Sequence, residues 1–264
     1  MIATTAAFAQ TSSVPPPQQR ADANSITLGY TLRIFGISFG SLDYAARLGG
    51  RRYDAEIHFQ TYGLAAVLWK AKIDTAAEGR VVSDALLPDF YTSRSFSRSG
   101  TQRWVRVDYT NGAPIMKADP PYDLSDYPVS DAQKRNAVDP VTAITSIIAG
   151  RNTSDREPCG RPLAIFDGRR RYDIVFTIMH QEPKESSGPH RRVCKGEYRH
   201  LAGLKQEVVD VSNVPAIYAE FVDVPTESHH YTIARAVWSS FMWRAVNARL
   251  TEVRIDSRPI ALER

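Results

Sequence analysis

The sequence contains no long apolar run and only two cysteines. No segment approaches the roughly 18 consecutive apolar residues that a membrane-spanning helix requires, so we expect a soluble protein without a transmembrane segment. The two cysteines, Cys159 and Cys194, do not form a Cys-x-x-Cys pair, which argues against a redox role. Neither lies near the N-terminus, where a lipid-anchored exported protein would carry one.

A complete signal peptide is also missing. Ala7-Phe8-Ala9 matches the small-x-small pattern that signal peptidase cleaves, but the positive region and most of the apolar region that precede such a site are absent. We interpret residues 1–9 as a signal-peptide remnant; an Ala-rich tail is the alternative. Residues 10–24, polar and rich in proline, are predicted to be a disordered linker before a single β-rich domain, 25–264. The expected location is the periplasm of a Gram-negative-type cell.

Export to an oxidising compartment permits a disulfide, and two cysteines are the minimum that can form one. We therefore predict a bond between Cys159 and Cys194, which are 35 positions apart. It would tie a polar loop to a later strand as a structural staple. Two reduced, buried thiols are the alternative.

Basic residues are in slight excess, 33 against 29 acidic residues, for a formal net charge of +4. Arginines cluster at Arg51-Arg52, Arg169–Arg171 and Arg191-Arg192. In an exported protein such clusters favour anionic envelope components over nucleic acid as partners. A solvated surface with scattered positive charge is the other interpretation.

Apolar residues at every second position indicate strands over most of the chain. Ile26, Leu28, Tyr30, Leu32 and Ile34 begin the pattern, and Gly49-Gly50 indicates a hairpin turn. We expect a mainly β fold: a large curved antiparallel sheet, either a half-barrel or a β-spiral. Further strands are expected at 41–47, 53–60, 65–73 (ending at Ala77-Glu78-Gly79), 80–85, 91–98, 102–110, 171–180, 192–200, 204–211, 216–223, 229–238, 240–247 and 250–256.

One segment is helical in pattern. Asp139 is a good N-cap residue, Pro140 suits the first helical position, and Gly150 suits the end. Val141, Ile144 and Ile148 would share the face that packs on the sheet. The loop-rich stretch 118–134 before this helix is predicted to be a surface strap or lid.

We find no catalytic motif and no cofactor or metal site. Gly36-Ile37-Ser38-Phe39-Gly40 matches the nucleophile-elbow pattern, but a β pattern follows it where that motif requires a helix. The six histidines are spread over separate elements without the converging ligand set that zinc needs.

The most distinctive polar segment is Asp167-Gly168-Arg169-Arg170-Arg171. Strand alternation would send Arg169 and Arg171 to one face, where with Asp167 they could hold an anionic group. Alternatively, Asp167-Gly168 makes a turn and the arginines pair with local carboxylates. On that second interpretation Gly168, like Asp139 and Pro140, has a structural role.

Several segments together resemble an uncharacterised exported family, domain of unknown function 3108. They are 139–143, a cysteine, Phe166–Asp173, a second cysteine and Gly203, with Tyr30, Gly36–Gly40, Tyr62–Leu64 and Leu87–Tyr91 before them. The resemblance implies a strongly curved antiparallel sheet around a short helix, similar to the periplasmic lipoprotein carriers of the Lol system. The family has no established activity, so it implies no catalytic residues.

Aromatic residues are numerous and would line a pocket if the concave face of the sheet were open. The leading hypothesis is a non-enzymatic periplasmic protein that binds a lipid, a lipoprotein or another hydrophobic envelope component there. An interaction module for envelope proteins or glycans is the alternative, and an enzyme is third. The aromatic residues in question are Tyr53, Phe59, Trp69, Trp104, Phe176, Trp238, Phe241 and Trp243.

Overall fold

A computed structural model gives the structure of the protein. It describes residues 24–68, 70–83, 85–96, 100–109, 113–124, 127–150, 159–160, 162–181, 191–205, 214–227, 229–241 and 244–261. The predicted signal-peptide remnant and nearly all of the linker lie outside these residues.

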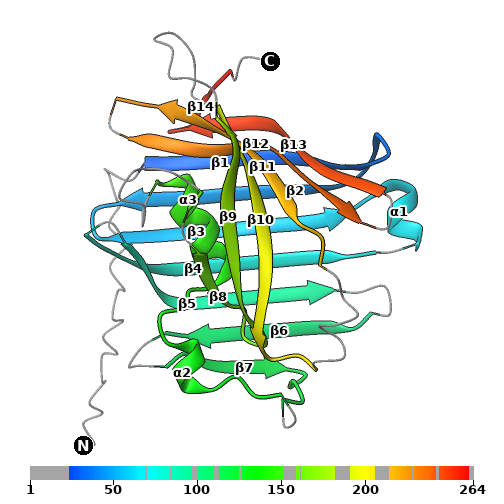
Figure 1. Ribbon diagram of the computed structural model, residues 1–264, viewed down its shortest axis with the longest axis vertical. Coiled ribbons are helices and arrows are strands. Elements are labelled where there is room, and N and C mark those ends of the chain that lie inside the picture. The colour runs from blue at the N-terminus through cyan, green and yellow to red at the C-terminus, as the bar shows by residue number, and fades with distance from the viewer. Residues whose placement is uncertain are drawn as a thin grey trace, which may run out of the picture.

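The described residues form three short helices and a strongly β-rich arrangement (Figure 1). The helices are α1 (Gly63–Leu68), α2 (Asp131–Lys134) and α3 (Pro140–Ile148). The strands are β1 (Asn24–Ile34), β2 (Ile37–Gly49), β3 (Arg52–Thr61), β4 (Lys72–Val82), β5 (Ala85–Phe96), β6 (Gln102–Asp108), β7 (Ile115–Asp119), β8 (Pro162–Phe166), β9 (Arg171–Gln181), β10 (Arg191–Ala202), β11 (Ile217–Pro225), β12 (His230–Phe241), β13 (Arg244–Ile255) and β14 (Arg258–Pro259).

All of these strands belong to one antiparallel sheet. Its order is β7-β6-β5-β4-β3-β2-β1-β13-β12-β11-β10-β9-β8, with β14 attached to β13. The sheet curves so strongly that β9 and β10 cross over the strands at its other end (Figure 1). It does not close, because β7 and β8 are left as its two edges. The predicted fold class, a large curved antiparallel sheet with a short helix packed on it, is confirmed.

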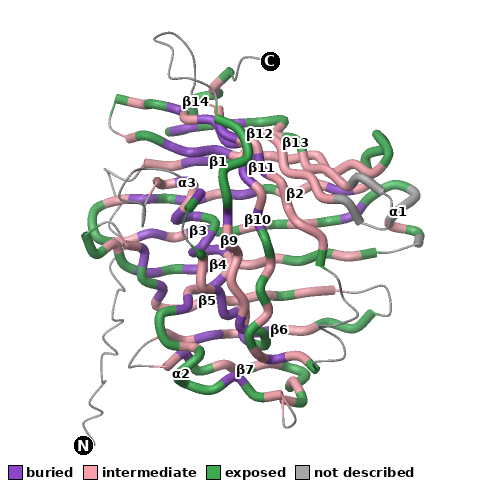
Figure 2. The backbone as a smooth tube through the Cα atoms, viewed as in Figure 1, coloured by how far each residue is buried: buried purple, intermediate pink, exposed green. Residues whose placement is uncertain are grey.

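Helix α3 lies inside this curve, as Figures 1 and 2 show. It contacts β3, β4 and β5 on one wall and β8 and β12 on the other. Asp139 caps its N-terminus and Pro140 is its first residue. Val141 and Ile148 are buried as expected, but Ile144 is 40% exposed. The buried face of α3 is instead the one that carries Thr142 and Thr145, because the hydroxyls of these residues bond to tyrosines of the sheet.

Several predicted element boundaries are wrong. The expected third strand at 65–73 begins as helix α1, and the strand β4 starts only at Lys72. The runs at 240–247 and 250–256 are not two strands: residues 240 and 241 end β12, and Arg244–Ile255 is one continuous strand, β13. The sequence pattern does not predict the short edge strands β7 and β8, because a strand of five residues shows too little apolar alternation. The predicted strand at 204–211 lies largely outside the described residues.

The segment Ala77-Glu78-Gly79 is likewise not a turn but the middle of β4. Gly79 is required there by close packing, since an added Cβ would lie 2.6 Å from Tyr53 Cε1 and 2.8 Å from Pro88 Cα. A bulge in the pairing with β5 occurs at this point. Glycine inside a strand often marks a bulge or such a close approach of neighbouring atoms.

We expect Gly79→Ala to destabilise the protein by about 2–3 kcal/mol, because backbone and a buried ring must both move. Urea unfolding followed by tryptophan fluorescence measures this. Gly50→Ala is the matched control: Gly50 has φ +55° and nothing lies within 4 Å of its added Cβ, so only about 1 kcal/mol of backbone strain is expected. Equal losses in the two variants would contradict the packing explanation.

Candidate functional site

A buried polar network fixes α3 to the concave face of the sheet. Asp139 is fully buried and accepts a hydrogen bond of 2.8 Å from the backbone N–H of Thr142. The Thr142 hydroxyl also donates to the other oxygen of Asp139, and it lies 2.6 Å from the Tyr53 hydroxyl. One turn later, the Tyr44 hydroxyl donates to Thr145 Oγ1 over 3.1 Å. The helix is therefore bonded to β2 and β3 through side chains that exclude water.

Burial controls the ionisation of this network. It raises the pKa of Asp139 from 3.8 to about 6, although hydrogen bonds from Thr142 oppose the shift. Burial also raises the pKa of Tyr44, Tyr53 and Tyr91 far above the usual value of 10. The three tyrosines stay protonated at physiological pH, so Tyr44 can act as the donor that the geometry requires.

The network bears directly on the expected ligand pocket, because α3 occupies the part of the concave face where a ligand would lie. Tyr53 and Phe176 are buried in the core around it. Trp104 is on the convex face of the sheet, as strand alternation from buried Val105 requires. The aromatic residues therefore do not gather into one lining, and Trp69, Trp243 and the side chain of Phe241 lie outside the described part of the chain.

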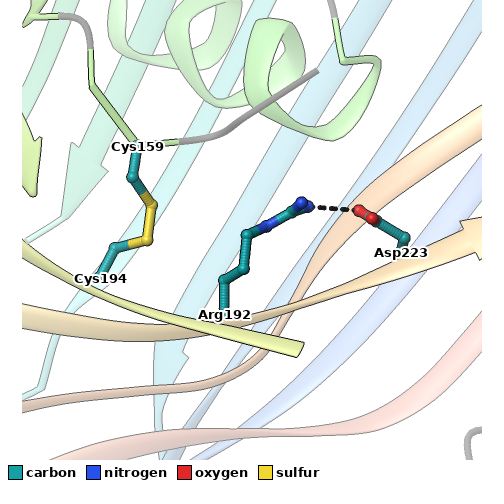
Figure 3. Close-up of a disulfide and its surroundings, with 4 residues drawn as sticks. All are labelled: Cys159, Arg192, Cys194 and Asp223. Atoms are coloured by element: carbon teal, nitrogen blue, oxygen red, sulfur yellow. Dashed lines mark hydrogen bonds and ion pairs between the residues drawn. A yellow bond between two sulfur atoms is a disulfide. The ribbon is translucent and has the colours of Figure 1, made fainter. Parts of the chain in front are cut away.

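The opposite wall carries the disulfide. Cys159 follows α3, Cys194 lies in β10, and their sulfurs are bonded with Cα atoms 6.2 Å apart, which confirms the predicted bridge (Figure 3). The pair is buried in a second apolar cluster with Phe176 and Phe221. The bond therefore connects Cys159, eleven positions after the last residue of α3, to β10.

An ion pair between a buried arginine and a partly exposed aspartate lies beside this disulfide. The Arg192 side chain is 3% exposed and bonds to Asp223 of β11, as Figure 3 shows. The same Asp223 oxygen accepts a hydrogen bond of 3.1 Å from the Thr232 hydroxyl. The carboxylate thus offsets the cost of burying the guanidinium.

The segment predicted as a polar or anion site forms a tight turn between β8 and β9. One oxygen of Asp167 accepts hydrogen bonds from the backbone N–H groups of Arg169 and Arg170, and the other lies 2.6 Å from the Arg170 guanidinium. Gly168 has φ +94°, which suits the turn. The structure therefore brings Asp167 together with Arg170, not with Arg169 or Arg171.

Arg171 forms its ion pair and hydrogen bonds with residues other than Asp167. Its side chain is 10% exposed, pairs with Asp173 at 2.6 Å and donates to the carbonyl of Gln133 at the end of α2. It therefore holds α2 against β9. Arg169 lies with its guanidinium 5.3 Å from the centre of the Tyr122 ring.

The basic clusters are largely neutralised by neighbouring carboxylates. In Arg51-Arg52, Arg169–Arg171 and Arg191-Arg192, five of the seven guanidiniums form ion pairs in the described structure. Arg191, for example, lies 2.7 Å from Glu220. This arrangement weakens the case for a broad docking surface for anionic partners.

The gap between the two edges of the sheet, which we call the seam, is crossed by the strap that follows β7. The ring of Tyr122 in the strap contacts two guanidinium groups. That of Arg103 in β6 lies 4.3 Å from the ring centre, and that of Arg169 in the β8–β9 turn lies 5.3 Å from it. Further along, Val138 bonds to the free edge of β8 as an isolated parallel bridge. The predicted strap at 118–134 is therefore the segment that joins the edges.

A groove of about 540 Å³ lies at this seam. Its deep side is apolar: Phe166 is 2% exposed and Val129 is 8% exposed. Lys134 lies at the α2 side, 3.1 Å from Asp131 and 5.8 Å from the centre of the Phe166 ring. The lining residues are Ala113–Met116, Leu124, Pro128, Val129, Asp131, Lys134, Phe166 and Gly168.

Sequence reasoning did not identify this groove. Met116 and Lys134 fall in short elements without clear periodicity, and only the proline-rich strap between them was noted. The groove exists because β7 and β8 stop short of each other, which depends on the curvature of the whole sheet.

Other sequence motifs do not form sites among the described residues. Phe35 and Gly36 make the β1–β2 hairpin turn, and Ser38 lies in β2 without the helix that a nucleophile elbow requires. Within the described ranges, no three His, Cys, Asp or Glu side chains are grouped as a metal site would need. None of the described helices is long and apolar enough to cross a bilayer.

Comparison with known proteins shows similarity to a solved structure. No family model matches the chain, and no curated protein does. A crystal structure of a β-barrel-like protein of domain of unknown function DUF1849 from Brucella abortus is similar with a TM-score of 0.47 and 11% sequence identity. The match covers 89% of this chain and 98% of that one. Membership in domain of unknown function 3108 is not established by these comparisons.

Proposed function

We propose that this protein binds an apolar chain of an envelope lipid or lipoprotein in the groove at the seam. The observation that carries the proposal is the groove itself: about 540 Å³, with Phe166, Val129 and Met116 on its apolar side. Ligand pockets for small molecules typically measure about 300–1,000 Å³ and are lined mostly by apolar residues. The concave face is filled by α3 and is not proposed as the site.

The occupant we propose is an acyl chain with an anionic end. A single narrow groove is far smaller than the surface that a stable protein partner needs, about 800 Å² on each side. The charged residues of the lining are Lys134 and Asp131, which pair at 3.1 Å, and the Lys134 ammonium group could also face a carboxylate or phosphate of the ligand. The buried ionisable groups of α3 are engaged in holding the helix, which supports a binding role over an enzymatic one.

A periplasmic location, and kinship with the 3108 family, belong to the same proposal. The disulfide supports an oxidising compartment, because such bonds rarely persist in the cytosol. The curved sheet around one helix agrees with the architecture that the family resemblance implies.

We expect purified protein to take up a fluorescent hexadecanoic acid and the Met116→Arg variant to bind it at least tenfold more weakly. Met116 is half-buried in the groove, and a guanidinium there would remove apolar contact. Fluorescence titration measures the affinity. Ile37→Arg is the control, since Ile37 is 70% exposed in the β1–β2 hairpin, far from the seam. No uptake by the wild-type protein, or equal uptake by both variants, would refute the proposal.

A further inference from the structure

The convex face of the sheet carries a second hollow that is independent of the seam. Two adjoining depressions of about 590 and 280 Å³ share Glu56 and Ala76 and together run across β1 to β6. Six neighbouring strands span about 24 Å at the usual strand spacing. We call this hollow the outer trough. The helix α3 and strands β8–β10 lie on the other face (Figure 1).

The register of the sheet explains the trough. Thr27, Ala45, Glu56, Ala76 and Thr92 are paired in sequence across five strands and so form one straight row. Each lies next to a buried inward residue, which places the row on the convex face. Because four of the five side chains are small, the row lies lower than the longer side chains on either side of it.

Longer polar side chains form the walls of the trough. On one side, His58 Nδ1 lies 2.9 Å from Asp74, and Arg94 and Trp104 continue the same row toward β6. On the other side, Arg47 pairs with Asp54 at 2.9 Å, and Asp54 lies directly opposite Glu78. Opposed carboxylates weaken strand pairing, and the Arg47 guanidinium offsets this repulsion at Asp54.

Glu56 stands in the floor between the two alanines. Its side chain is 54% exposed, and its carboxylate lies 3.7 Å from His58 Nε2, beyond hydrogen-bond distance. It therefore presents an acceptor to anything lying in the trough. The half-buried ring of Trp104 lies at one end.

We propose that the outer trough binds a neutral or amino-sugar glycan chain. Both donors (Arg47, Arg94) and acceptors (Asp54, Glu56, Asp74, Glu78) line it, as sugar hydroxyls require, since each hydroxyl both donates and accepts. The indole of Trp104 offers a flat apolar surface for the C–H face of a sugar ring. Four carboxylates against two guanidiniums in the lining disfavour an acidic glycan.

The geometry argues against the other polymers. An extended peptide adds to a sheet through a free strand edge, whereas the strands under the trough are paired with neighbours on both sides. Large exposed apolar side chains do not line the trough, so an acyl chain would find little to contact. The inference does not depend on the lipid site at the seam.

Isothermal titration calorimetry with neutral hexasaccharides (chitohexaose, cellohexaose and maltohexaose) tests the proposal. We expect at least one to bind, and Trp104→Ala and Glu56→Gln each to weaken it at least tenfold. Glu252→Gln is the matched control, because Glu252 is an exposed residue of β13 that pairs with Arg254 outside the trough. Its affinity should equal that of the wild-type protein.

Because Trp104 is half-buried, Ala76→Arg serves as a second variant that fills the trough without removing core contacts. It should abolish binding while thermal unfolding stays within a few degrees of wild type. The proposal is overturned if no neutral hexasaccharide binds, if the trough variants bind as well as Glu252→Gln, or if only oligogalacturonate or hexalysine binds.

Discussion

The double variant Cys159→Ala/Cys194→Ala is expected to lose about 3–4 kcal/mol of the free energy of unfolding. The two cysteines are 35 positions apart, and the loop that the bond closes contains strands β8 and β9. The loss of a constraint of that length on the unfolded chain accounts for this value on the chain-entropy model. Urea unfolding of the oxidised wild-type protein and of the variant measures the difference.

The expected loss of stability also has a cause in the folded state, where the two cysteines are buried. Cys194 is fully buried and Cys159 nearly so, in contact with Phe176 and Phe221. Without the bond, Cys159 loses its covalent link to β10, while the hydrogen bond from the Gly160 N–H to the Phe176 carbonyl of β9 remains. Reductant should lower the stability of the wild-type protein to that of the variant and leave the variant unchanged. A difference below about 1 kcal/mol would show that this bond contributes little to the fold.

The second large effect concerns Asp139 and pH. The pKa of this carboxyl is raised to about 6 in the folded protein from 3.8, because it is fully buried. The folded state therefore binds the proton more tightly than the unfolded state does. The contribution of Asp139 to the free energy of unfolding therefore rises as pH falls from about 7 to about 4. The same contribution is lost as pH rises through 6. The full difference corresponds to about 3 kcal/mol.

Asp139→Asn should remove this pH dependence, because an amide does not titrate in this range but can still accept from the Thr142 N–H. Urea unfolding at pH 4.5, 6 and 7.5 gives the difference between wild type and variant, in which the effects of other carboxylates cancel. Asp131→Asn is the control, since Asp131 is 72% exposed at the start of α2. A constant difference between wild type and Asp139→Asn at all three pH values would mean that Asp139 is not titrating between 4 and 7.

Asp139 also illustrates how much local sequence can predict. A cap residue followed by proline sets the start of a helix through contacts within four residues, so α3 was predicted within two residues at each end. Its surroundings were not predictable in the same way. Tyr53 and Tyr44, which bind the helix, lie 89 and 101 positions away in the sequence.

The candidate sites depend even more on long-range order. The arginine-rich turn at 167–171 can be recognised as a motif in the sequence. The geometry of the turn decides that Asp167 pairs with Arg170 and not with Arg169 or Arg171. Met116 and Lys134 become neighbours of Phe166 only because the sheet curls until its two edges approach each other. Glu56 and Ala76 share a trough only through the register of β3 and β4.

By itself, the sequence determined the antiparallel β class, the position of the helix, and the disulfide, because alternation and capping are local and two cysteines leave one pairing. The tertiary structure decided which face is covered, where the sheet fails to close and which side chains form rows across it. These depend on curvature and register, which are set by contacts between strands far apart in the chain, and a period of two cannot encode them.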